Sequence, residues 1–116
     1  MFNFLKFNKK KSEDTPVVTK KTISMLSNSD VTTRREMVNS LSILSSGDPS
    51  TQAAIVNAGG IIPLIRLLQD MDLEVRQNAA WALWGLSFNH NENQSAVASA
   101  GGIVSLVNLL QDADTV

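Results

Sequence analysis

The sequence predicts an all-α protein built from stacked copies of one helical unit, and three observations support this fold class. First, residues 52–72 recur as residues 94–114, with 12 of 21 positions identical and no gap. Second, apolar residues within each copy follow helical spacing, and third, a pair of glycines stands at the same place in both. A period of 42 residues is typical of helical solenoids, whose units bury their apolar faces only against their neighbours.

The middle helix of each unit is predicted from apolar residues at positions i, i+3, i+4 and i+7. Pro63 falls in the first turn of this helix, where its missing amide proton is tolerated. The apolar face is written twice, as Ile61, Leu64, Ile65 and Leu68 and as Ile103, Leu106, Val107 and Leu110.

A short helix is predicted before each middle helix, over about residues 50–57 and 92–99. Asp48 followed by Pro49 is typical of an N-cap with proline at the first helical position. The pairs at 59–60 and 101–102 end these helices, because glycine adopts the left-handed conformation of a helix C-terminus without a Cβ penalty.

A third and longer helix is predicted after each middle helix, over about residues 31–45 and 73–88. Asp30 and Asp72 are placed to cap these helices, and Asp114 holds the same repeat position, where another third helix should begin. The predicted buried stripe of the second such helix comprises Val75, Ala79, Leu83 and Leu86.

The chain is predicted to have a basic tail at 1–16 and a repeat domain at 17–116. The domain divides into a partial unit at 17–47, a full unit at 48–89 and a partial unit at 90–116. In the first unit, Thr19 and Thr22 replace Ile61 and Leu64, as expected for a capping helix whose outer side faces water.

The segments NENQSAVASAGGIVSLVNLLQD and VRQNAAWALWGLS together resemble the armadillo repeat family, which includes catenin and importin-alpha types. The resemblance covers residues 17–116. It implies a right-handed α-α superhelix, an armadillo-type solenoid of about two and a half repeats, whose third helices line a concave peptide-binding groove. It also implies a non-enzymatic scaffold that binds a protein or an extended peptide.

Groove residues are assigned by repeat position from the same resemblance. In importin alpha, a tryptophan of the third helix flanks the side chains of the peptide, and an asparagine four residues later bonds its backbone. Trp81 matches the tryptophan, but Gly85 replaces the asparagine, and the preceding unit has Asn39 and Ile43 instead. The candidate groove residues are Arg35, Glu36, Asn39, Glu74, Gln77, Asn78, Trp81, Gly85 and Phe88.

Several candidates have a structural interpretation beside the functional one. Trp81 is interpreted as a peptide platform or as packing between third helices. Trp84 is interpreted as bordering the groove or as covering the seam to the next unit, and the seam is favoured. Arg35 and Glu36 could select a charged ligand or form a solvated pair. Arg34 and Arg76 are expected to pair with acidic neighbours or caps.

Composition argues against catalysis, cofactors and nucleic-acid binding. The net charge is −1, the chain contains no cysteine, and His90 stands alone without a second metal ligand or a nucleophile nearby. No glycine-rich phosphate loop followed by Lys-Ser/Thr occurs. We therefore expect no enzymatic activity, no metal site and no cofactor, and an intracellular location in cytoplasm or nucleus.

The tail has two interpretations. Residues 1–21 carry a net charge of +4 and residues 22–116 carry −5. Phe2, Phe4 and Phe7 followed by Lys9–Lys11 could contact a membrane surface, but a disordered terminus is favoured.

Two other functions stay open at this level: a nuclear-transport adaptor of importin-alpha type, against which Gly85 argues, and a targeting fragment of a larger armadillo-repeat ubiquitin ligase. The apolar middle helix at 103–110 has no third helix after it, so we also expect self-association through residues 92–116.

Overall fold

The computed structural model describes residues 20–114, with side chains up to residue 111, and every regular element in this range is a helix. The predicted all-α class is confirmed. The tail at 1–16 and Thr19 lie outside the described residues. The elements are α2 (Lys20–Ser24), the 3-10 helix η1 (Met25–Ser27), α3 (Val31–Ser45), α4 (Pro49–Asn57), α5 (Ile61–Leu67), α6 (Leu73–Ser87), α7 (Asn91–Ser99) and α8 (Gly102–Asp114).

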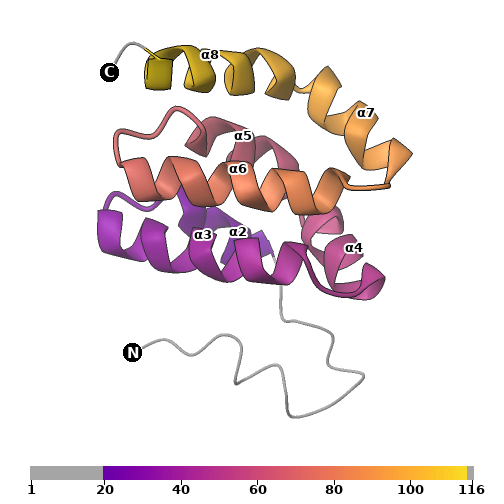
Figure 1. Cartoon of the computed structure of the whole chain (residues 1–116). Helices are drawn as coiled ribbons and strands as arrows, with labels where there is room; N and C mark the ends of the chain where they lie inside the picture. Colours follow the sequence, from indigo (N-terminus) through magenta and orange to yellow (C-terminus); the bar gives the residue numbers. More distant parts are fainter. Residues whose placement is uncertain (1–19, 115–116) are drawn as a thin grey trace.

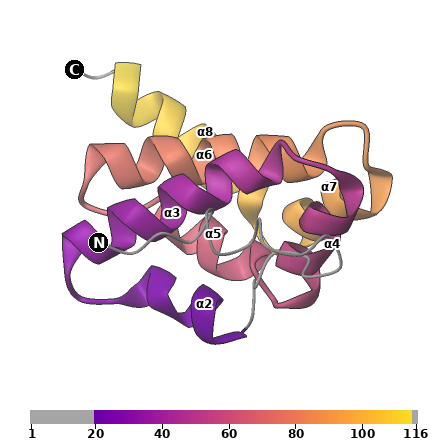
Figure 2. The same ribbon diagram turned by 90° about the horizontal axis from the view of Figure 1, so that it is seen from below.

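The two third helices, α3 and α6, lie side by side and run in the same direction (Figure 1). Helix α5 packs behind α6, and α8 lies along the side of α6 that faces away from α3 (Figure 1). The view from below shows α2 and α5 in a second layer, with α4 and α7 together at one end of the long helices (Figure 2). The repeating unit is therefore a short, a middle and a third helix, as the sequence predicted.

Aspartate side chains cap the N-termini of the three helices for which N-caps were predicted. The carboxylates of Asp30, Asp48 and Asp72 accept hydrogen bonds from amides three residues later, which otherwise lack an intrahelical partner. Pro49 occupies the first turn of α4. The three predicted caps are confirmed.

The first glycine of each pair, which follows α4 or α7, has the predicted left-handed conformation. Gly59 has φ of 83° and Gly101 has φ of 86°. A residue with a Cβ is disfavoured at such angles, so the sharp turn into the following helix depends on glycine.

One continuous core joins the units. The predicted faces of α5 and α6 are buried, and Met37, Val38 and Leu41 of α3 meet them from the preceding unit. Ile23 and Leu26 close the core at the first unit. Because these side chains come from neighbouring units, no unit has a core of its own.

Helix α8 is longer than α5, its counterpart in the full unit. Helix α8 continues to Asp114, whereas α5 ends at Leu67. The turn after α5 is held by Asp70, whose carboxylate accepts hydrogen bonds from the Asp72 amide and the Arg34 guanidinium.

Candidate protein-interaction surface

The outward sides of α3 and α6 form one surface, which we call the α3–α6 surface. Both helices are regular and packed on the common core, which fixes where the backbone of each outward residue lies. Eight of the nine candidate residues are exposed or half-buried on it: Arg35, Glu36, Asn39, Glu74, Gln77, Asn78, Trp81 and Phe88.

Three aromatic side chains line α6 and form what we call the aromatic strip. The Trp81 ring is stacked on Trp84, with centroids 5.3 Å apart and planes at 26°. The Trp84 ring in turn contacts the Phe88 ring, with centroids 5.1 Å apart. Spacings of three and four residues place these side chains over one another on the helix surface. Trp81 is 57% exposed, as predicted, so it is not packed between α3 and α6.

Trp84 belongs both to the strip and to the predicted seam. It lies between Trp81 and Phe88, yet it also lines a cavity with residues of α7 and α8, including Val97 and Ile103. The sequence left the border of the groove and the seam open for Trp84, with the seam favoured. Its stacking on Trp81 was missed because ring stacking depends on side-chain conformation as well as on spacing.

Gly85 is not part of the exposed surface, which corrects its assignment as a groove residue. It is buried, and a Cβ built on it would lie 3.0 Å from the Ser45 carbonyl oxygen and 3.1 Å from the Ser45 Cβ. The absence of a side chain allows α6 to approach α3 closely at this point. The residue therefore serves helix packing and offers no side chain to a ligand.

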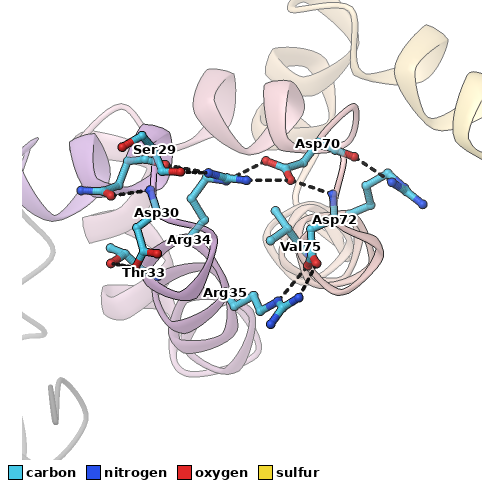
Figure 3. A network of polar contacts seen from close by, with 10 residues as sticks. Ser29, Asp30, Thr33, Arg34, Arg35, Asp70, Asp72 and Val75 are labelled. Carbon is cyan, nitrogen blue, oxygen red and sulfur yellow. Dashed lines mark hydrogen bonds and ion pairs between the residues drawn. The ribbon is translucent and has the colours of Figure 1, made fainter.

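Arg35 is bound within the chain, so it is neither a free ligand-selecting group nor half of a solvated pair with Glu36. Its guanidinium forms two hydrogen bonds with Asp72, Nη2 to Oδ1 at 2.6 Å and Nε to Oδ2 at 3.1 Å (Figure 3). The Arg35 hydrogen bond, together with the Val75 amide, lowers the pKa of Asp72 to about 2. The same hydrogen bond and the charge of Asp72 raise the pKa of Arg35. The cationic charge of Arg35 is thus largely matched.

A second ion pair joins the same two units. Arg34 Nε lies 2.9 Å from Asp70 Oδ2, while Nη1 of Arg34 donates to the carbonyl oxygens of Asn28 and Ser29 (Figure 3). Arg76 repeats part of this arrangement by donating to the Asp70 carbonyl oxygen at 2.8 Å. The predicted pairing of Arg34 and Arg76 with acidic neighbours or caps is confirmed for Arg34, whereas Arg76 binds a backbone carbonyl.

The charge that remains open on the α3–α6 surface is negative. Among residues 20–111, Glu36 has no ion-pair partner, and Glu74 lies 3.8 Å from the already paired Arg35. Carboxylates at this surface favour a cationic ligand at low ionic strength, since screening weakens such exposed interactions in salt.

Ile43 is an exposed apolar residue that the sequence analysis did not assign to the surface. It is half exposed on α3, at the repeat position that Gly85 holds on α6. An isoleucine on the outward face of a helix was the available signal.

His90 has a structural role. Its Nδ1 accepts a hydrogen bond from the Asn93 amide at 3.1 Å and caps α7. Within the described part of the chain, no cluster of three or more His, Cys, Asp or Glu side chains could hold a metal ion. None of the helices there has the length and apolar character needed to cross a bilayer.

The stacked short, middle and third helices define a helical-repeat solenoid, and the comparisons specify its type. Residues 48–88 match the model of the Armadillo/beta-catenin-like repeat. The central unit is an armadillo repeat, and the fold is an armadillo-type α-solenoid.

Two solved structures are similar to the chain, both described as engineered proteins from the Northeast Structural Genomics Consortium. One is 37% identical with a TM-score of 0.74, over 78% of this chain and 37% of that chain. The other is 36% identical with a TM-score of 0.74, over 81% of this chain and 23% of that chain. The chain thus spans well under half the length of either. No curated protein matches the chain.

Proposed function

We propose that the chain is a protein-interaction module that binds an extended partner segment along the α3–α6 surface. Armadillo repeats are generally protein-interaction scaffolds. The observation that supports binding along the α3–α6 surface is the aromatic strip. More than half of the Trp81 side chain in this strip is exposed, although α6 itself is packed on the core. Large aromatic side chains are costly to leave in water unless a partner covers them, and they dominate the energetics of interfaces.

The chemistry of the surface suggests what the partner segment presents. The faces of Trp81 and Trp84 can cover an aliphatic side chain or attract a cationic one. The amides of Asn39 and Gln77 can both donate to and accept from an extended backbone. Because the open charges are those of Glu36 and Glu74, a segment with at least one Lys or Arg fits better than an acidic one.

The proposal does not depend on a backbone clamp at position 85. Gly85 has no side chain, and the polar residues nearby serve as caps or as ties between units. These uses of the polar groups support a binding role without catalysis.

Selection from a displayed library of random 12-residue peptides tests this function. We expect enriched peptides to carry basic and apolar residues and to bind the wild-type chain. Trp81→Ala should weaken their binding about tenfold or more, the loss expected of an interface hot spot. Circular dichroism melting should show a nearly unchanged Tm, because Trp81 is exposed.

The matched control is Ile62→Ala, which removes an exposed apolar side chain from α5, outside the α3–α6 surface. Peptides whose affinity is the same for Trp81→Ala and wild type would contradict the proposal, as would a library that yields no binder.

A further inference from the structure

A second apolar site lies on the far side of α6 from α3. A cavity of about 300 Å³ opens where α6, α7 and α8 meet. Helix α8 continues this site with Val107 and Leu110, which are exposed. We call the cavity and this face of α8 the α6–α8 seam. Six of its lining residues are Ala80, Trp84, Ser87, Val97, Ile103 and Leu106.

The repeat shows what the same surface looks like when it is covered. Each of these six residues has a counterpart 42 positions earlier, and all six counterparts are buried. Ile61 is 8% exposed, whereas Ile103 is 55% exposed. Ser42 is 3% exposed, whereas Trp84 is 52% exposed. The six counterparts are Val38, Ser42, Ser45, Ile55, Ile61 and Leu64.

The element that packs over the earlier site is α6. It lies along α3 and packs on α5, and its stripe of Val75, Ala79, Ala82 and Leu86 is fully buried. Gly85 allows the contact, because it brings the α6 backbone onto Ser45. Ser87 is the counterpart of Ser45 in the seam.

Gln94 in the seam makes the same kind of hydrogen bond as its counterpart Gln52 makes in the preceding unit. Gln52 Nε2 donates to the Ser45 carbonyl at 2.7 Å and reaches the Gly85 carbonyl of the covering helix at 3.4 Å. Gln94, its counterpart, donates to the Ser87 carbonyl at 2.9 Å. Its amide is thus placed to reach a backbone carbonyl of an element docked in the seam.

We propose that the α6–α8 seam docks an amphipathic α-helix of a partner protein. The chemistry of that helix follows from α6: an apolar stripe at i, i+4, i+7 and i+11, and a glycine or alanine where the helix crosses Ser87. The seam shares Trp84 with the aromatic strip, but its cavity and the face of α8 lie outside the α3–α6 surface. The inference therefore goes beyond the proposed function, and variants of α8 test it separately.

A second copy of the chain is a poorer occupant than a partner helix. The helix of this chain whose stripe matches the seam is α6, and that stripe is fully buried in its own core. To offer it, a second copy would have to unfold its full unit, whereas an unpacked partner helix has no such cost.

A synthetic peptide of residues 72–88, with a fluorescent label at its N-terminus, is the probe. It carries the α6 stripe and can be added to the intact chain. We expect its fluorescence anisotropy to rise on addition of the chain. Its helical signal at 222 nm should also increase, because a 17-residue helix is marginal in water until it packs. The Gly85→Leu peptide should bind about tenfold more weakly, since its side chain meets Ser87.

Variants of the chain locate the binding. Val107→Glu places a carboxylate on the open face of α8 and should weaken the peptide about tenfold or more. Its fold should persist, because Val107 is 46% exposed. Ile62→Glu, at a similarly exposed site on α5, is the matched control and should leave the affinity unchanged.

Three results would overturn the proposal. One is absence of peptide binding. Another is binding that responds to Trp81→Ala and not to Val107→Glu, which would place the peptide on the α3–α6 surface. The third is a dimer in analytical ultracentrifugation that Val107→Glu dissociates and the peptide does not, which would make a second copy the occupant.

Discussion

The carboxylate of Asp72 both caps α6 and binds Arg35 of α3, with Arg35 Nη2 at 2.6 Å from Asp72 Oδ1 and the Val75 amide at 3.0 Å from Oδ2. Its counterpart Asp30 caps α3 through Thr33 but has no ion pair among residues 20–111. The Asp72 side chain thus caps α6 and links it to the preceding unit.

The comparison of Asp72→Asn with Asp30→Asn separates the two roles. Asparagine caps a helix about as well as aspartate, so neither variant should lose its cap. Only Asp72→Asn loses the ionic part of the Arg35 interaction, and we expect it to lower the Tm more than Asp30→Asn does. Thermal melting by circular dichroism measures the difference, and equal Tm values would show that the ion pair adds no stability.

The Asp72 carboxylate should make stability depend on pH. Its pKa is lowered from an ordinary value of about 3.9 to about 2, so the folded state favours the charged form. The stabilisation is therefore complete above about pH 4 and is lost as the pH falls towards 2. Urea unfolding at pH 5, 4, 3 and 2 should show this fall, with a smaller slope in Asp72→Asn. Parallel profiles would contradict the assignment to Asp72.

Substitution of Gly85 should act through packing between α3 and α6. A Cβ would lie 3.0 Å from the Ser45 carbonyl oxygen, a backbone atom that cannot rotate away. Gly85→Val should destabilise the fold by about 1–3 kcal/mol through overpacking. Gly85→Ala should cost less, because alanine gains up to about 1 kcal/mol of helix propensity over glycine. Urea denaturation measures both, and a more stable valine variant would refute the close approach.

Gly59 offers a test of backbone conformation without packing. Its φ is 83°, and a Cβ there would meet nothing within 4 Å. Gly59→Ala should therefore cost about 1–2 kcal/mol from the left-handed conformation alone. Gly59→Asn should cost less, because asparagine tolerates this region better. If both variants have the same Tm as the wild type, the turn has relaxed to another conformation.

Truncation of a side chain should lower the stability much more on the buried side of α6 than on its exposed side. Leu83→Ala removes a side chain that is 2% exposed and should cost about 2–5 kcal/mol. Trp81→Ala removes a larger but exposed side chain and should cost far less. Chemical denaturation of both variants measures this contrast, and a loss at Trp81 as large as that at Leu83 would mean that Trp81 supports the core.

The sequence by itself determined the helices, their starts and ends, and their buried faces. The stripes of α5 and α6 follow a period of 3.6 residues, and the caps at Asp30 and Asp48 act on amides three residues away. The turn at Gly59 needs one backbone angle. All of these are local interactions, so they can be recognised from residue type and spacing.

Only the tertiary structure decided what the candidate surface offers a partner. Gly85 is buried rather than part of the surface because Ser45, forty residues earlier, packs against it. The Arg35 guanidinium pairs with Asp72, 37 residues later, and the Trp84 ring stacks on Trp81 as well as lining the seam. These outcomes depend on the distance between neighbouring helices and on side-chain conformation. The repeat identifies which helices are neighbours, but it does not specify how closely they approach or which charges meet.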